Sequence, residues 1–205
     1  MQKIIFATGN EGKMREIRQI LGDMPLEILS LKEAGLDPEI HEDASSFAGN
    51  ALIKARTVHA LPEGSQAIVL ADDSGLEVDW LNGEPGIYSA RYLGESVPYS
   101  IKNQSILDRL QGVTGEARSA RFRCAVAAVF PDGQEAVSEG TIEGQIAGEI
   151  LGDGGFGYDP IFWLPGEGLT TAQLPAEKKN AISHRGKALR GIRPVIEQWL
   201  AGRAV

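Results

Sequence analysis

The chain begins with a short apolar run that leads through a glycine turn directly into a helix-like segment. Residues 3–7 have the pattern of a buried strand, and Asn10 is placed to cap the helix that follows. Met14, Ile17 and Leu21 share one face of that helix. A strand that leads through glycine into a helix directs backbone N–H groups and the positive helix end at one point. This arrangement favours an α/β fold.

Strand and helix patterns then alternate irregularly, which predicts a mixed α/β chain rather than a regular βαβ array. We expect residues 1–205 to form a single domain. Ser45 or Ser46 can cap the second helix, Ser183 can cap the last one, and Pro194 should kink or split it. The expected strands are 26–31, 66–71, 76–80, 118–130 and 135–146, and the expected helices are 47–60, 99–110 and the segment after 183.

Composition limits the setting and the partners of the chain. No apolar run approaches the ~20 residues of a membrane helix, and the first apolar stretch is too short for a signal peptide, so we predict a cytoplasmic protein with no membrane partner. Cys124 is the only cysteine, which rules out an intramolecular disulfide and a cysteine-rich zinc site. The net charge of −8 disfavours nucleic acid as a partner.

The first glycine turn is a candidate phosphate site. A glycine loop at a helix start, with a lysine one turn in, can surround a phosphate group with donors. The segment differs from a Walker A motif, which needs glycine at Ala7 and Ser or Thr at Met14. The alternative is a tight turn with an exposed lysine. The residues are Thr8, Gly9, Asn10, Glu11, Gly12 and Lys13.

Two acidic segments are candidates for metal or water chemistry. Asp72 and Asp73 follow a predicted buried strand, where a carboxylate can hold a metal ion or orient a water molecule. Neighbouring residues of a strand point to opposite faces, so the two aspartates need not serve one ion. Glu42 and Asp43 could supply a further magnesium ligand. The alternative for both segments is solvated loop charge.

Three further segments carry polar or aromatic groups suited to a ligand. Phe47, Asn50 and Lys54 share one helix face. The loop 154–160 combines glycines with Phe156, Tyr158 and Asp159, which could stack on a base and bind its edge, or simply anchor the loop. His184 and Arg185 begin the last helix and could act as donors or be surface charge.

Together and in this order, these segments are similar to the inosine/xanthosine triphosphate pyrophosphatase family. The likeness spans residues 8 to 185 and departs from the family at Lys178, where an acidic residue is usual, so Lys178 competes with Lys179 as the matching lysine. The matched segments are Thr8-Gly9-Asn10 with Lys13; Phe47, Asn50-Ala51 and Lys54-Ala55; Ala71 to Val78; Gly83, Pro85-Gly86 and Ser89 to Tyr92; Phe156 to Pro160; and Ile182 to Arg185.

The resemblance implies a mixed α/β fold with a long central β-sheet flanked by helices, and two lobes with an active-site cleft between them. It implies a homodimer that hydrolyses dITP, ITP, XTP and dXTP to the monophosphate and pyrophosphate with Mg²⁺. Such a reaction removes non-standard purine nucleotides before they are misincorporated into DNA and RNA.

The resemblance also implies roles for residues. Thr8 to Lys13 would bind the triphosphate, with positive charge from Lys54 and Lys179, and Ser74 would contact the nucleotide. Asp73 is the expected general base, with Asp72 as the alternative, and Mg²⁺ would be held by Asp73 and Glu42. Phe156 would stack on the purine within the segment Phe156, Gly157, Tyr158 and Asp159, and its edge would be read by Asp159, His184 and Arg185.

Donors in the base site would suit the 6-keto oxygen of hypoxanthine and xanthine and reject adenine, because an unmet buried donor costs ~1–3 kcal/mol. No residue explains the rejection of guanine. Three alternatives stay open: a related pyrophosphatase acting on pyrimidine or methylated nucleotides, a nucleotide sensor without catalysis, and a nucleic-acid-binding protein, which the net charge disfavours.

Overall fold

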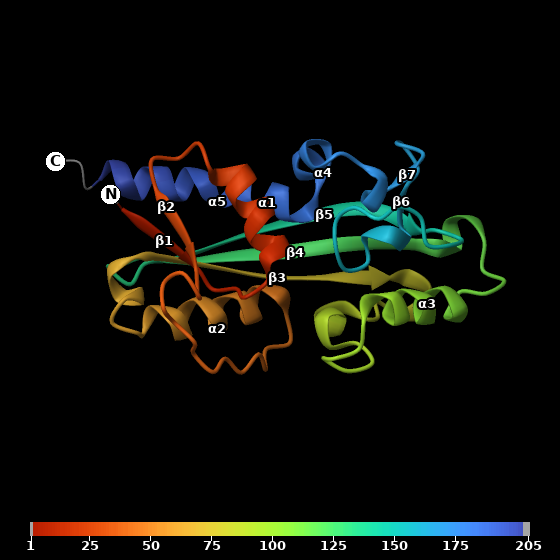
Figure 1. Cartoon of the computed structure of the whole chain (residues 1–205), viewed down its shortest axis with the longest axis horizontal. Coiled ribbons are helices and arrows are strands. Elements are labelled where there is room, and N and C mark those ends of the chain that lie inside the picture. The colour runs from red at the N-terminus through yellow and green to blue at the C-terminus, as the bar shows by residue number, and fades with distance from the viewer. Residues whose placement is uncertain (1, 203–205) are drawn as a thin grey trace. The chain divides into compact units, whose positions relative to one another are not determined.

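A single mixed sheet organises the chain (Figure 1) in the computed structural model, which describes residues 2–202. The sheet has seven strands in the order β2-β1-β3-β4-β5-β6-β7. β1 runs parallel to both β2 and β3, whereas β6 is antiparallel to β5 and β7. The strands are β1 Lys3–Phe6, β2 Glu27–Ser30, β3 Ile68–Val78, β4 Ser119–Val129, β5 Glu135–Ile146, β6 Phe162–Leu164 and β7 Leu169–Thr170.

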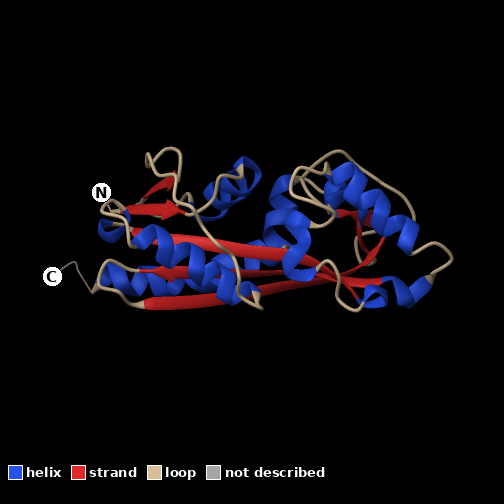
Figure 2. Cartoon of the chain, turned by 90° about the horizontal axis from the view of Figure 1, so that it is seen from below, coloured by secondary structure: helices blue, strands red, loops and turns tan. Residues whose placement is uncertain are grey.

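Helices connect and cover these strands (Figure 2). The Asn10 side chain accepts a hydrogen bond from Lys13 N at the start of α1, and Ser46 accepts one from Gly49 N at the start of α2. Both caps were predicted, because Asn and Ser oxygens satisfy the free N–H groups of a first helical turn. The helices are α1 Glu11–Leu21, α2 Phe47–His59, α3 Tyr99–Arg109, α4 Ala176–Ile182 and α5 His184–Ala201.

The chain divides into two compact units. The first comprises Met1–Asp73, Cys124–Gly140 and His184–Val205. In this unit α1 and α5 lie together on one side of the strands and α2 lies on the other (Figure 1). Its core is formed mainly by strand and helix residues that are almost fully buried, including Phe6, Ile17, Leu70, Val126, Phe130, Leu189 and Ile196.

The second unit comprises Ser74–Arg123 and Thr141–Ser183. It contains α3, α4, β6 and β7, together with the remaining parts of β3, β4 and β5. Its separate core includes Leu76, Ile106, Phe122, Ile161 and Phe162.

The predicted mixed α/β fold with a central sheet and flanking helices is confirmed. One prediction was wrong: residues 66–71 and 76–80 are not two paired strands, because β3 runs without a break from Ile68 to Val78. The Asp-Asp-Ser-Gly segment therefore lies within a strand and not in a turn. β3 is buried along most of its length, so this segment is not solvated loop charge. Pro194 lies inside α5 and does not split it. α4, β6 and β7 were not predicted.

The prediction of two lobes corresponds to the two compact units, and the cleft between them stays a prediction. Among the described residues, no helix is both long enough and apolar enough to span a membrane.

Candidate active site

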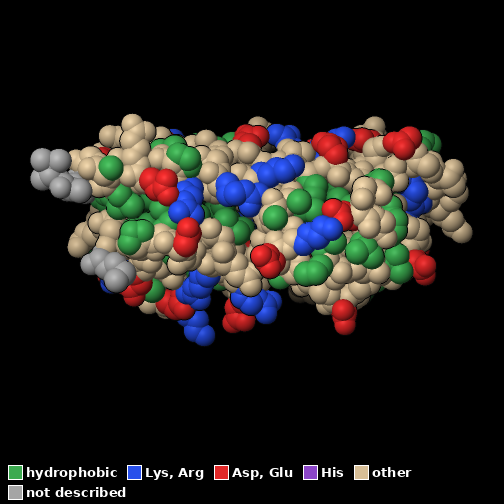
Figure 3. All heavy atoms as spheres, turned by 90° about the horizontal axis from the view of Figure 1, so that it is seen from above, with side chains coloured by type: hydrophobic (Ala, Val, Ile, Leu, Met, Phe, Trp, Pro, Cys, Tyr) green, Lys and Arg blue, Asp and Glu red, His purple; other side chains and the backbone are tan. Residues whose placement is uncertain are grey.

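Charged side chains of both signs are intermixed on the face shown in Figure 3. Many exposed charges form ion pairs, such as Arg18 with Glu33 and Arg193 with Asp23. Exposed pairs of this kind contribute little to stability. A buried charge is costly unless it is paired, so the buried charged groups of each unit are the informative ones.

The predicted phosphate segment forms a tight turn at the start of α1. Thr8 Oγ1 accepts a hydrogen bond from Asn10 N at 3.1 Å, and Asn10 Oδ1 accepts one from Lys13 N at 3.1 Å. Gly9, Asn10 and Glu11 are exposed, and Gly12 is half-buried. The start of α1 therefore lies at the protein surface, where an anion can approach the positive helix end, while the N–H groups of Asn10 and Lys13 bind side-chain oxygens.

Asp72 lies on β3 beside this turn, and its side chain is completely buried. Its Oδ1 lies 2.9 Å from Lys13 Nζ, and its Oδ2 lies 3.0 Å from Arg185 Nη2. Burial disfavours the ionised carboxyl, but the positive charges of Lys13 and Arg185 outweigh burial and hold the pKa of Asp72 well below the usual aspartate range. Asp72 is therefore an ionised carboxylate whose two oxygens both have cationic partners.

Asp73, the next residue, has different partners. Its Oδ2 accepts a hydrogen bond from Asn50 Nδ2 at 3.1 Å, and its Oδ1 lies 3.3 Å from Lys54 Nζ. Lys54 Nζ also lies 3.0 Å from Glu42 Oε2. Asn50 and Lys54 both belong to α2. They reach the same carboxylate because residues four apart share a helix face. One ammonium group thus joins the two carboxylates that were predicted to bind metal.

The pKa values of Asp73 and Lys54 shift in a way that burial and pairing explain. Burial raises the pKa of Asp73, and the opposing effects of Lys54 and Asn50 only partly offset it. Burial disfavours the charged form of Lys54, but Asp73, Asp72 and Glu42 together raise its pKa. Asp73 is therefore the more readily protonated of the two aspartates.

The chemistry of these side chains fits a magnesium ion. Among residues 2–202, no group of three or more His, Cys, Asp or Glu side chains is arranged to hold a metal. Mg²⁺ is usually held by only one or two carboxylates and completes its shell with water and substrate phosphates. Glu42 and Asp73 converge on one cation, Lys54 Nζ, and so provide a pair of carboxylates of the required kind.

The predicted base-binding loop lies in the second unit and is held by Asp159. The Asp159 side chain accepts hydrogen bonds from Phe156 N at 2.8 Å and from Thr171 Oγ1 at 2.8 Å. Lys179 Nζ lies 2.6 Å from Asp159 Oδ2 and 4.9 Å from the centre of the Phe156 ring. Lys179 is buried and Lys178 instead pairs with Glu167 at an exposed position, so Lys179 is the lysine that reaches the loop.

Glycine shapes this loop at two positions. Gly155 has a φ of +68°, and a Cβ added there would lie 2.2 Å from Asp159 Oδ2. Gly157 has a φ of +69°, and its carbonyl accepts a hydrogen bond from Asn103 Nδ2 of α3. Tyr158 is buried and donates from its hydroxyl to the Ser89 carbonyl at 2.7 Å. Tyr158 therefore anchors the loop to the core, which was the alternative to a contact with the base.

The remaining predicted site residues are divided between the units. Ser74 continues β3 beyond Asp73 and belongs to the second unit. His184 and Arg185 begin α5 in the first unit, and both are buried. In the first unit, Lys54 contacts Glu42 and Asp73, and Lys13 contacts the neighbouring Asp72. The second unit contains the other set of predicted residues: Phe156, Gly157, Tyr158, Asp159 and Lys179.

Comparisons with known proteins show the family of the chain. The sequence pattern described as the Ham1 family matches residues 4–195. The chain belongs to the Ham1 family. A dITP/XTP pyrophosphatase of Clostridium perfringens is 47% identical over 192 residues, which are 92% of this chain and 94% of that protein. One of Bacillus licheniformis is 44% identical over 97% of this chain and all of that protein.

Solved Ham1 structures share the fold. A HAM1 protein from Coxiella burnetii has a TM-score of 0.84 and 38% identity, with 97% of this chain and all of that chain covered. The Ham1 protein of Staphylococcus aureus has a TM-score of 0.83 and 39% identity over 96% and 99% of the two chains.

Sequence reasoning missed one contact of the candidate site and one of its residues. Asn50 was expected on the helix face of Phe47 and Lys54, and its direct hydrogen bond to Asp73 was not predicted. Glu16 was not singled out, although it stands one helical turn after Lys13 and is buried, with Arg185 as an ion-pair partner. A carboxylate spaced three residues from a predicted phosphate lysine was the available signal.

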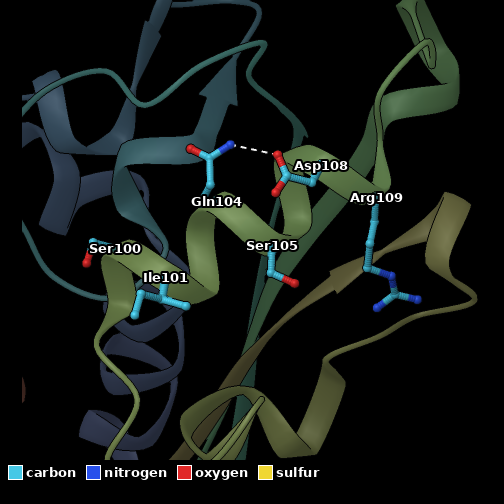
Figure 4. A pocket seen from close by; sticks show the side chains of 6 residues that line it. All are labelled: Ser100, Ile101, Gln104, Ser105, Asp108 and Arg109. Carbon is cyan, nitrogen blue, oxygen red and sulfur yellow. Dashed lines mark hydrogen bonds between the residues drawn. The ribbon is translucent and has the colours of Figure 1, made fainter.

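A pocket of about 580 Å³ lies on α3 in the second unit (Figure 4). Gln104 and Asp108 are hydrogen-bonded to each other at its edge. None of the residues that line this pocket was predicted to bind substrate. The lining residues are Ser100, Ile101, Gln104, Ser105, Asp108 and Arg109.

Proposed function

We propose that this chain hydrolyses non-standard purine nucleoside triphosphates, dITP and ITP together with XTP and dXTP, to the monophosphate and pyrophosphate. Relatives named dITP/XTP pyrophosphatase match more than nine-tenths of the chain. The observation that carries the proposal is that two consecutive carboxylates of β3 each bind a lysine, Asp72 with Lys13 and Asp73 with Lys54. This arrangement combines cations for phosphate groups with a carboxylate for the attacking water. By this activity the protein cleanses the nucleotide pool and prevents misincorporation into DNA and RNA.

The start of α1 is the proposed triphosphate site. The start of α1 is exposed, and the positive end of that helix favours phosphate oxygens. Lys13 and Lys54 add positive charge, which stabilises the extra negative charge of a phosphoryl-transfer transition state. Ser74 would contact the nucleotide where β3 leaves the first unit.

Asp73 is the proposed general base. Its raised pKa makes it a better proton acceptor than Asp72, and Asn50 and Lys54 fix its orientation. Asp72 is tied to Lys13 and Arg185 and is less suited to accept a proton. Glu42 and Asp73 would hold Mg²⁺, which neutralises phosphate charge when it is bound.

The loop from Phe156 to Asp159 is the proposed purine site. Phe156 would stack on the base. The resemblance implied that Lys179 adds positive charge for the triphosphate, but its ammonium lies 4.9 Å from the centre of the Phe156 ring, where it would offer a donor to a 6-keto oxygen. Asp159 holds both groups, and its own contact with the base edge stays a prediction, as does that of His184. The two ion pairs of Arg185 favour a different role for that residue.

A homodimer in the cytoplasm is also proposed. Trp80, Tyr88, Leu93 and Ile101 of the second unit are each more than half exposed, and large apolar side chains are often covered by a partner. Analytical ultracentrifugation of the intact chain tests this proposal, and a monomer at micromolar concentration would refute it.

Product analysis with dITP and Mg²⁺ tests the proposed reaction. We expect monophosphate and pyrophosphate in equal amounts, whereas diphosphate with phosphate would refute it. Parallel assays of UTP, methylated nucleotides and the standard triphosphates separate the reaction from that of a related pyrophosphatase. Tight dITP binding without pyrophosphate release would indicate a sensor.

A further inference from the structure

Four charged side chains of the first unit form an alternating chain. Lys13 and Glu16 lie one turn apart on α1, Asp72 lies on β3, and Arg185 begins α5. Lys13 Nζ is 2.9 Å from Asp72 Oδ1, Arg185 Nη2 is 3.0 Å from Asp72 Oδ2, and Arg185 Nη1 is 2.6 Å from Glu16 Oε2. Opposite charges therefore meet at each step of the chain.

Arg185 is the residue that links the two carboxylates of this series of ion pairs. Its guanidinium presents N–H groups in a fixed planar fork, and it uses separate nitrogens for Glu16 and Asp72. The side chain is only 2% exposed, so water cannot replace either carboxylate. Asp72 and Glu16 both raise the pKa of Arg185 despite its burial. Because Glu16 Oε2 lies 2.6 Å from Arg185 Nη1, Glu16 helps to fix where the guanidinium lies.

The position of Arg185 in turn fixes Asp72. Arg185 Nε donates to Asp72 Oδ2 at 3.1 Å, and Arg185 Nη2 lies 3.0 Å from the same oxygen. The Cys124 thiol lies 3.9 Å from it. With Oδ2 held, Oδ1 is turned toward Lys13. Lys13 is the member of the chain nearest to solvent, with 18% of its side chain exposed. A defect at Glu16 would thus reach Lys13 through two ion pairs.

We propose that Glu16 is a positioning residue that acts through Arg185 and Asp72 to aim Lys13 at the phosphate groups of the ligand. The inference rests on the proposed function, in which Lys13 binds the triphosphate. It also assigns Arg185 a role in the phosphate site. A flexible lysine that is held in advance loses less conformational freedom when it binds phosphate, so positioning appears as affinity.

Pyrophosphate binding by isothermal titration calorimetry tests the proposal without any purine base. The variants are Glu16→Gln, Lys13→Met and the double variant, with dITP kinetics in parallel. Asp23→Asn is the matched control, because Asp23 follows α1 and pairs with Arg193 of α5 at an exposed position. We expect Glu16→Gln to weaken pyrophosphate binding and raise KM on the order of tenfold, with kcat nearly unchanged.

The double variant separates positioning from general damage. In the Lys13→Met background, Glu16→Gln should cause no further loss, because the group that it positions is absent. An equal loss in both backgrounds, no loss in either, or an equal loss in Asp23→Asn would overturn the proposal. A wild-type chain that binds pyrophosphate but releases none from dITP would refute the proposed function and leave this test intact.

Glu16→Gln could unfold the chain, which circular dichroism would reveal. The paired variant Glu16→Leu with Arg185→Met then replaces one buried ion pair with apolar groups, a change that proteins often tolerate, and leaves Asp72 with Lys13 as its partner. In this variant, once circular dichroism confirms the fold, we expect weaker pyrophosphate binding than in the wild type, because Arg185 no longer holds Asp72. Pyrophosphate binding equal to that of the wild type would overturn the proposal.

Discussion

Asp72 and Asp73 are consecutive residues of β3, yet their side chains belong to different sets of ion pairs. Asp72 contacts Lys13 and Arg185, whereas Asp73 contacts Lys54 and Asn50. Successive side chains of a strand point to opposite faces, so one strand can serve both sets. The pKa of Asp72 is lowered and that of Asp73 is raised, which gives the two carboxylates different tasks.

Replacing Asp73 with Asn should abolish turnover and leave the fold intact. The amide keeps the shape of the side chain but cannot accept the proton of the attacking water, and loss of a general base costs typically 10²–10⁴-fold in rate. Pyrophosphate release from dITP measures the effect, and circular dichroism checks the fold. Near-normal activity in this variant would exclude Asp73 as the base.

Replacing Asp72 with Asn should instead destabilise the protein. The change leaves Lys13 and buried Arg185 with one carboxylate fewer, and breaking a buried ion pair typically costs about 3–5 kcal/mol. Urea unfolding of the two aspartate variants side by side tests the contrast. A stability loss at Asp73 that equals or exceeds the loss at Asp72 would contradict it.

The purine loop should not tolerate a side chain at Gly155. Alanine there would combine a φ of +68° with a Cβ at 2.2 Å from Asp159 Oδ2, and strain of this kind costs about 1–3 kcal/mol. We expect a lower melting temperature and a higher KM for dITP in Gly155→Ala. Gly166→Ala is the control, because a Cβ at Gly166 meets no atom within 4 Å. Equal effects at the two glycines would count against the proposed loop geometry.

Local signals in the sequence predicted much of this fold. Asn10 and Ser46 cap helices where expected, because a cap depends on the residue itself and its immediate neighbours. β3 was wrongly divided at Asp72 and Asp73, since carboxylates and glycine resemble a turn when their partners are unknown. The partners of Asp72, which are Lys13 and Arg185, lie 59 and 113 positions away.

The site could be predicted in outline but not in its connections. The sequence identified Lys13, Lys54 and Asp73, and the structure places them in one unit. The resemblance implied a base-edge role for Arg185, which stays a prediction. Spacing along a chain does not show that α5 packs against α1 and brings Glu16 to the Arg185 guanidinium. Tertiary packing supplies that information.

Cys124 should be unreactive in the folded chain. It is 2% exposed, and burial followed by the nearby Asp72 carboxylate raises the pKa of its thiol, whereas the thiolate is the reactive form. A thiol reagent such as dithionitrobenzoate should therefore modify almost no native protein. In guanidinium chloride it should modify one thiol per chain, since the sequence contains a single cysteine. Rapid labelling of the native protein would show that β4 opens readily.

Glu33 should make stability depend on pH at the acidic end. Hydrogen bonds from the Ser30 backbone and hydroxyl, and then the Arg18 guanidinium, lower its pKa from 4.5 to about 2. Because the folded pKa is lower than the unfolded one, the stabilisation is present above about pH 4.5 and is lost as the pH falls toward about 2. Glu33→Gln should therefore lower the urea midpoint slightly at neutral pH, mainly through the weaker Ser30 hydrogen bonds, because water screens the exposed pair with Arg18. This small difference from wild type should shrink through the same pH window.

Glu39→Gln is the control for the Glu33 prediction, because Glu39 is more exposed than Glu33 and should change the midpoint less at any pH. A Glu33 effect that stayed constant from neutral pH down to about pH 3 would contradict this assignment.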